Sequence, residues 1–187
     1  RFYEDMHVDH KRLSHEEAMQ AIYIKGRDNA RTPVQWDASA NAGFSPEGVT
    51  TWINVNPNYP EINAEAVLAD EDSIFYHYQH LVNLRRGELK DLMVYASFAP
   101  VDSVQVPHDE DEAVYAYTRT GGADGSPANE SLLVISNFTA EEQERDFALL
   151  NEAREAGARV ELVSSNYKDD AGSTLRPYEA KVYHIVR

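Results

Sequence analysis

The stretch from Gly26 to Asp37, GRDNARTPVQWD, is the most informative part of the chain. It contains two arginines, two aspartates, an asparagine, a glutamine, a tryptophan and a proline. A helix is expected to end at Gly26, so Arg27 and Arg31 are predicted to lie on a loop. A guanidinium group can make two-pronged hydrogen bonds to a carboxylate or to paired hydroxyls, and a nearby aromatic ring can stack on a sugar. The pattern therefore allows a binding site for a small polar ligand.

The same residues also allow a purely structural interpretation. Arg27 could pair with Asp28 and Arg31 with Asp37, so that the two ion pairs hold the loop together. Trp36 would then be a core anchor. From the spacing alone, we favour this structural interpretation over a binding site.

The segments around this loop have a helical pattern. Ser14 begins a capping box with a glutamate three residues later, and the helix that it opens is predicted to end at Gly26. Asn63 is expected to cap a short helix over residues 64–68, and a broad apolar stripe predicts a helix over residues 73–86. No strand is predicted among these helices. We expect their apolar faces to pack against a part of the protein that precedes this chain.

From about residue 92 the apolar period shortens to two, which is typical of strands. Strands are predicted at residues 94–98, 113–118, 132–136, 160–163 and 181–186. The run GGADG at residues 121–125 predicts a surface turn, and residues 149–156 a short helix or turn. Strands separated by turns favour an antiparallel sheet or sandwich. We therefore expect two parts, residues 1–90 and residues 91–187.

Composition excludes several classes of function. The 187 residues include 17 Lys and Arg against 32 Asp and Glu, a net charge of −15, so nucleic acid and anionic membrane surfaces are poor partners. No run approaches 18 apolar residues, and no export signal is visible. The absence of cysteine excludes disulfides, thiolate zinc sites and cysteine nucleophiles. It fits the cytoplasmic location that we expect.

GRDNARTPVQWD resembles the signature after the last active-site strand in oligo-1,6-glucosidase and related α-glucosidases of glycoside hydrolase family thirteen. Further segments are similar to that family, in the family's order: MQAIYIKGRDNARTP, NAGFS, WINVNPNYPEIN, DSIFYHYQHLVNLRR, VYAYTRT, LLVISNFTAEE and TLRPYEAKVY. The resemblance covers the chain from Ala18 to Arg187 and is weaker before it. Val34 stands where the family often has Met.

The resemblance implies an architecture for both parts. Residues 1–90 would be the tail of a catalytic (β/α)8 barrel, with its last loop and closing helix, and residues 91–187 a C-terminal antiparallel β-sandwich domain. The family's nucleophilic Asp, acid/base Glu and third, stabilising Asp all precede the GRDNARTP signature. We therefore expect no catalytic residue in this chain, no turnover by it alone, and the missing N-terminal barrel as its partner.

The resemblance also implies a substrate and its ligands. The parent would be a retaining, exo-acting enzyme that hydrolyses terminal α-1,6 or α-1,4 glucosidic bonds of short oligosaccharides. Arg27 aligns with an arginine that holds the terminal glucose in the −1 subsite and pairs with an aspartate from early in the barrel. Arg31 aligns as a second substrate-binding candidate, for which we favour a structural role in the loop. No cofactor is expected.

Three other readings of function remain open. The chain could be an independent carbohydrate-binding β-sandwich with a helical leader, or part of a sucrose-isomerising relative. It could also resemble the non-catalytic heavy chains of membrane transporters, against which the retained Arg27 argues.

Three other groups of residues are candidate sites by residue type and spacing. The acidic run at residues 109–112 is expected to be a solvated turn. His7 and His10 could share a helical face and bind a metal, but we favour a solvated polar face and expect no metal. Trp52 and Tyr59 could line a sugar-binding wall, although we favour their burial against the barrel.

Overall fold

A computed structural model describes residues 2–121 and 129–187, without the side chain of Asn29. The chain divides into two compact units, residues 1–75 and residues 76–187, each described below by itself. This division lies nearer the N-terminus than the expected one, because most of the helix over residues 73–86 falls in the second unit. The expected domain boundary at residue 90 stays a prediction.

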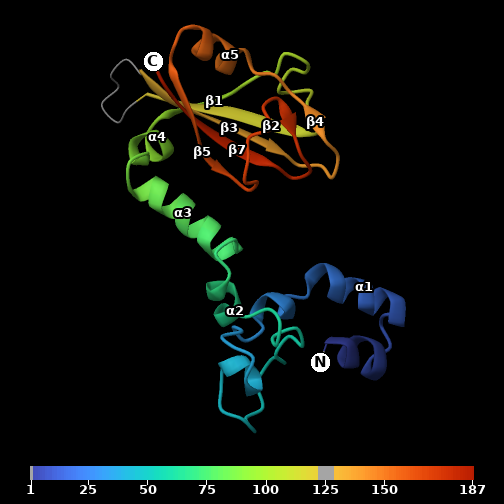
Figure 1. The fold of residues 1–187 in the computed structure, drawn as a ribbon. Helices are drawn as coiled ribbons and strands as arrows, with labels where there is room; N and C mark the ends of the chain where they lie inside the picture. Colours follow the sequence, from blue (N-terminus) through green and yellow to red (C-terminus); the bar gives the residue numbers. More distant parts are fainter. Residues whose placement is uncertain (1, 122–128) are drawn as a thin grey trace. The chain divides into compact units, whose positions relative to one another are not determined.

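The N-terminal unit consists of short helices joined by long loops (Figure 1). Its elements are η1 (Glu4–Asp9, a π-helix), α1 (His15–Lys25), η2 (Asp28–Arg31), η3 (Ala40–Gly43) and α2 (Ala64–Ala69). The predicted capping box of α1 is present: the Ser14 hydroxyl accepts from the backbone N–H of Glu17 at 3.2 Å, and the Glu17 carboxylate accepts from the backbone N–H of Ser14 at 2.8 Å. The Asn63 side chain caps α2, also as predicted.

A tight turn follows the GRDNARTP loop. Gly43 has a φ of 65°, and a Cβ atom there would lie 2.6 Å from a carboxylate oxygen of Asp37, so this position requires glycine. Ala42 in the same turn is fully buried, and its carbonyl accepts from the backbone N–H of Trp36 at 2.8 Å. The turn therefore fixes the C-terminal end of the loop.

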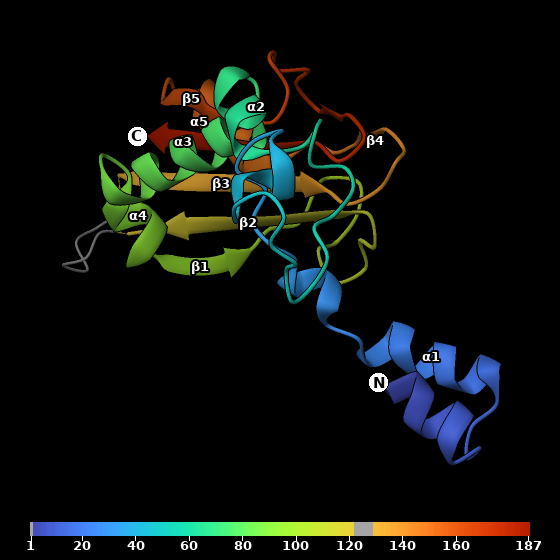
Figure 2. The same cartoon turned by 90° about the horizontal axis from the view of Figure 1, so that it is seen from below.

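The C-terminal unit contains one five-stranded antiparallel sheet. Its elements in chain order are α3 (Ile74–Arg86), α4 (Lys90–Val94), β1 (Ser97–Pro100), β2 (Val114–Thr120), β3 (Glu130–Asn137), β4 (Gln143–Glu144), α5 (Ala148–Glu155), β5 (Arg159–Ser165), β6 (Thr174–Leu175) and β7 (Ala180–Val186). The order across the sheet is β1-β2-β3-β7-β5, and β4 pairs with β6 in a separate two-stranded ribbon. Figure 2 shows β1, β2 and β3 side by side.

Each face of the sheet carries its own apolar core, because alternate residues of a strand point to opposite faces. On one face Leu133 and Tyr183 pack with Phe147 and Leu150 at the start of α5. On the other face Leu132 packs with residues of α4 and its flanks: Leu89, Leu92 and Ala96. The second layer on the α5 face is a helix with a small ribbon rather than a second large sheet, so the structure does not confirm the expected sandwich in that form.

The predicted strand at residues 94–98 is only partly right. Residues 90–94 form α4, and β1 starts at Ser97. Leu89, Leu92 and Ala96 recur at helical spacing and bury one face against Leu132, which outweighs the β-type alternation of the local sequence. Of the short helix or turn expected at residues 149–156, the structure shows the helix, α5. Most of the predicted turn at residues 121–125 lies outside the described residues.

Among the described residues, none of the helices has the length and apolar character needed to cross a membrane.

Candidate functional site

The loop after α1 presents both candidate arginines to solvent. Helix α1 ends where predicted, since the backbone of Gly26 is extended, with φ −64° and ψ 133°. A Cβ atom on Gly26 would lie 2.5 Å from the carbonyl oxygen of Ile22, so a larger residue would not fit there. Arg27 follows directly as the N-cap of η2, and Arg31 is the last residue of that turn. Both side chains are exposed. The prediction that these arginines lie on an accessible loop is therefore correct.

The ion pairs of the structural interpretation are not formed. Within the described part of the chain, neither Arg27 nor Arg31 makes a side-chain hydrogen bond or an ion pair. Asp37 instead accepts from the hydroxyl of Ser39 at 2.5 Å and from its backbone N–H at 2.8 Å. These two bonds lower the pKa of Asp37, the hydroxyl contributing most. The loop is thus ordered without its arginines, which leaves both guanidinium groups available to a ligand.

A second loop is tied to the first by one side chain. The amide nitrogen of Gln35 donates to the side-chain oxygen of Asn58 at 3.1 Å and to the carbonyl of Ile62. The backbone N–H groups of Ala64 and Glu65, at the start of α2, donate to the carbonyls of residues 35 and 36. The GRDNARTP loop, the loop over residues 52–62 and α2 are therefore held together as one substructure.

A pocket of about 520 Å³ opens between these two loops. It is lined by Asp28, Thr32 and residues 52–57. Trp52 is 92% exposed within this chain, whereas Tyr59 is half-buried. The burial of both residues against the barrel, which we favoured from the sequence, stays a prediction. Sequence reasoning missed the grouping of Asp28 and Thr32 with Trp52. The available signal was that Asp28 and Thr32 belong to the same sequence signature as Arg27.

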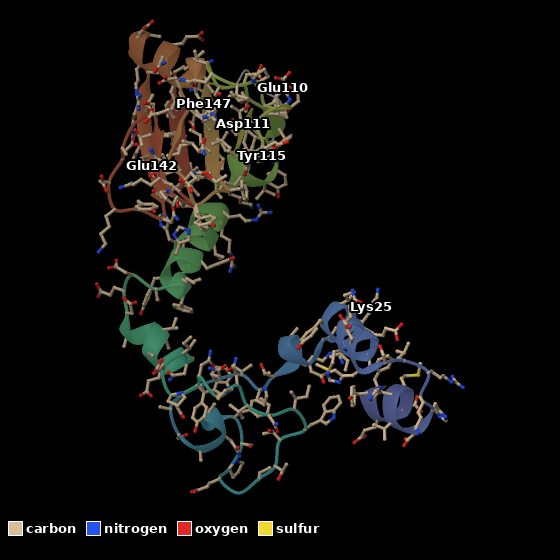
Figure 3. All side chains as sticks on the ribbon, turned by 90° about the vertical axis from the view of Figure 1, so that its right-hand side faces the viewer. Lys25, Glu110, Asp111, Tyr115, Glu142 and Phe147 are labelled. Atoms are coloured by element: carbon tan, nitrogen blue, oxygen red, sulfur yellow. The ribbon has the colours of Figure 1, made fainter. Side chains whose placement is uncertain are left out.

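The acidic run at residues 109–112 is not uniformly solvated. Glu110 is exposed at the surface, but the Asp111 side chain is 5% exposed and accepts two hydrogen bonds from Arg145, at 2.7 and 3.2 Å (Figure 3). Burial alone would raise the pKa of Asp111, and the hydrogen bonds from Arg145 and from the backbone of Val114 outweigh it, so that the pKa lies below its usual value. Asp111 is thereby a structural partner of Arg145 and is not poised for acid/base chemistry.

The histidines of the N-terminal unit make local contacts. His10 pairs with Asp5 at 3.1 Å, and the Nδ1 atom of His7 bonds the carbonyl of Leu13 at 2.9 Å. Across residues 2–121 and 129–187, no group of three or more histidine or acidic side chains is arranged to hold a metal ion. On the α3 helix, His80 bonds the carbonyl of Val163 at 2.8 Å.

Comparison with known proteins gives this loop a context. Residues 2–95 match the family "Alpha amylase, catalytic domain". The chain is 43% identical to the oligo-1,6-glucosidases of Bacillus cereus and Parageobacillus thermoglucosidasius, over 91% of its own length and 28% of theirs. It thus spans less than a third of the length of these relatives.

Solved protein structures are similar to this chain as well. Trehalose-6-phosphate hydrolase of Bacillus licheniformis is 37% identical with a TM-score of 0.74, over 96% of this chain and 30% of that one. An isomaltulose synthase from Klebsiella is 31% identical with a TM-score of 0.71, over 98% of this chain and 30% of that one. The catalytic-domain match covers half of the sequence and includes the arginine-bearing loop, and the chain therefore belongs to the α-amylase family, glycoside hydrolase family thirteen.

Proposed function

We propose that this chain is the C-terminal portion of a retaining, exo-acting α-glucosidase that hydrolyses terminal α-1,6 or α-1,4 glucosidic bonds of short oligosaccharides. The named relatives at 43% identity support the oligo-1,6-glucosidase type. Residues 1–90 would be the last loop and closing helix of the catalytic barrel, and residues 91–187 the C-terminal β domain. The match to the catalytic-domain family ends at residue 95, close to that boundary.

One observation carries the proposal: the Arg27 guanidinium is exposed and has no ion-pair or hydrogen-bond partner in the described structure. No described residue pairs with this guanidinium, so it can be held by the barrel aspartate that the resemblance implies and can bind hydroxyls of a neutral sugar with directed donors. We assign Arg27 to the terminal glucose, in the −1 subsite. Arg31, equally exposed, is proposed as a second ligand of the same loop.

The chemistry itself would come from outside this chain. A retaining glycosidase needs two carboxyl groups about 5–5.5 Å apart, one as nucleophile and one as acid/base. The family resemblance implies that those carboxylates precede the GRDNARTP signature and would lie outside this chain. What this chain contributes is the positioning of the terminal sugar.

The test is substitution of Arg27 in the full-length protein. Losing a hydrogen bond to a charged group costs about 1.5–3 kcal/mol, so Arg27→Ala should lower kcat/KM for isomaltose by roughly tenfold to a hundredfold. Arg27→Lys should restore little, because an ammonium group lacks the planar fork. Arg12→Ala, a change of another exposed arginine of the N-terminal unit, is the matched control. Wild-type kcat/KM in Arg27→Ala, with a lowered melting temperature, would make Arg27 a structural residue of the loop.

Sucrose isomerisation is the second candidate, because isomaltulose and trehalulose synthases are among the similar solved structures, at 28–31% identity. The two activities differ in the acceptor of the glucosyl group, which is water in hydrolysis and fructose in isomerisation. Product analysis of the full-length protein separates them. Glucose release from isomaltose supports the hydrolase, and conversion of sucrose to an isomeric disaccharide supports the isomerase.

A further inference from the structure

We propose that the apolar groove between α3 and the sheet of the C-terminal unit is the surface against which the preceding part of the catalytic domain packs in the full-length protein. The inference rests on the family of the chain and on the part of the proposed function that places this chain at the C-terminal end of a longer protein. It assigns one occupant to a face that the C-terminal unit leaves open.

The inner strands of the sheet are apolar on both faces. β3 contains the uninterrupted apolar run LLVI at residues 132–135, and Val182 on β7 lies opposite Val134 on the same face. A strand of an antiparallel sheet with one solvated face alternates apolar and polar residues instead. The sequence of these strands therefore predicts that each face of the sheet is covered.

The C-terminal unit covers only one of the two faces completely. On the α5 face, Leu133 and Tyr183 are at most 2% exposed. On the other face, α4 and its flanks cover Leu132, whereas Val134 and Val182, further along the strands, are only partly buried. The cover of this second face is therefore incomplete within the described residues of the unit.

A groove of about 720 Å³ lies along the incompletely covered face. Tyr78, Leu81 and Val82 of α3 line one side of it, and Figure 1 shows this helix leading into α4. Tyr117 and Val134 are among the sheet residues that line the other side. Tyr78 is 65% exposed and Val82 46%, so the groove-facing side of α3 lacks a full apolar cover.

A row of three aromatic rings continues the apolar surface past the groove. The ring centroids of Phe98 and Tyr117 lie 5.1 Å apart, and those of Tyr115 and Tyr117 lie 5.8 Å apart. Phe98 and Tyr115 are 49% and 43% exposed, and Tyr115 lies outside the groove lining. An exposed apolar surface that extends beyond the cavity is typical of an interface with a large partner rather than of a site for one small molecule.

The family match identifies this partner. The catalytic-domain match covers residues 2–95 and so includes both α3 and α4, while the strands that complete the groove come after it. The elements of a domain pack around a shared core, so further segments of the catalytic domain are expected against α3. The chain spans only 28% of the length of the oligo-1,6-glucosidases, which leaves a large part of those relatives outside the match. The corresponding part of the full-length protein is the occupant that we infer.

Cysteine labelling tests whether the groove is covered. The sequence contains no cysteine, so Val82→Cys places a single thiol of this chain in the groove. Asn151→Cys, at an exposed position of α5 on the other face of the sheet, is the matched control. A maleimide should label Val82→Cys at least about tenfold more slowly in the full-length protein than in the chain alone, and Asn151→Cys at similar rates in both. Mass spectrometry of the peptide that contains each position follows the reaction.

Three results of the labelling would overturn the proposal. Equal rates for Val82→Cys in the two proteins would mean that the groove stays open in the full-length protein. Slow labelling of the chain alone, at a concentration where sedimentation shows a monomer, would assign the cover to the N-terminal unit of the same chain. Protection of the full-length protein that disappears when a dimer is diluted to a monomer would assign the cover to a second copy.

A charge in the groove provides a second measurement. Val82→Glu should leave the melting temperature of the chain alone within about 2 °C of wild type, because the position is accessible to solvent there. In the full-length protein it should lower the melting temperature by about 5 °C or more, because an unpaired carboxylate would be buried between two apolar surfaces. Asn151→Glu should leave both proteins within about 2 °C of wild type. An equal effect of Val82→Glu on the two proteins would contradict the inference.

The outcomes separate this inference from the proposed function, because neither measurement depends on activity. Wild-type kcat/KM in Arg27→Ala would refute the role of Arg27 and would leave the labelling of Val82→Cys unchanged. Equal labelling of Val82→Cys in the two proteins would refute the docking surface and would leave the effect of Arg27→Ala unchanged.

Discussion

Replacing Lys181 by methionine should destabilise the C-terminal unit strongly. Lys181 is fully buried on β7, and its Nζ atom donates to Asp170 at 3.1 Å and to the carbonyls of Gly172 and Thr174 at 2.9 and 3.1 Å. Methionine fills a similar volume but satisfies none of these acceptors. Removing one partner of a buried ion pair costs about 3–5 kcal/mol, which lowers the melting temperature of a chain of this length by about 6–20 °C.

Calorimetry of the whole chain checks this prediction, with Lys90→Met, on the exposed surface of α4, as the control. The control should stay within about 0.5 kcal/mol of wild type. Both tryptophans lie in the N-terminal unit, so tryptophan emission reports that unit separately. A melting temperature of Lys181→Met within about 2 °C of wild type would show that the buried network adds no net stability.

The pH dependence of the stability of Lys181→Met is a second, independent prediction. Burial alone would raise the pKa of Asp170, but hydrogen bonds from Tyr183, from the backbone of Gly172 and from Lys181 outweigh it, and the pKa lies below its usual value. A carboxyl with a depressed folded pKa stabilises the fold above its unfolded pKa of about 3.9 and loses that contribution as the pH falls through the folded value. The stability gap between wild type and Lys181→Met should therefore be full near neutral pH and narrow below about pH 4.

Three further predictions concern Asp111, Gly43 and the activity of the chain alone. Asp111→Asn should cost about 3 kcal/mol in urea unfolding, because it breaks the buried pair with Arg145; an unchanged midpoint would contradict this. Gly43→Ala should cost about 1–3 kcal/mol by the transition in tryptophan emission, because it forces alanine to a φ of 65° against Asp37; a wild-type transition would oppose that reading. The chain alone should release no product from an aryl α-glucoside, and turnover proportional to protein would place catalytic carboxylates within it.

Local signals predicted much of the fold. The capping box at Ser14, the stop at Gly26 and the cap at Asn63 depend on neighbouring residues, so the sequence shows them directly. The strand expected at residues 94–98 was only partly right, because burial of Leu92 against Leu132 is a contact between distant segments. Such contacts are absent from a local pattern.

The sequence alternation in β7 was a signal for the burial of Lys181, but our sequence analysis did not use it. The alternation in β7 places Lys181 on the same face as Tyr183 and Ile185, and both of those side chains are buried. A lysine on a core face needs an acceptor, and the loop that bends back from Asp170 to Thr174 supplies one carboxylate and two carbonyls. The position could be read from the sequence, but its partners could not.

The candidate site, too, could be predicted from the sequence only in part. That Arg27 lies on an exposed loop follows from the helix stop at Gly26, and its place in the family signature suggested the sugar. The pocket needed the structure, because Asp28 and Trp52 are brought together by the bonds of Gln35 to Asn58 and Ile62. Those bonds also explain how the loop can leave its arginines unpaired. The loop's shape is held by the Gln35 amide, the Ser39 contacts of Asp37 and the backbone of α2, all of which are neutral donors. Within the described residues the guanidinium groups make no bond that shapes the loop, and the proposed function assigns their charge and donors to a sugar.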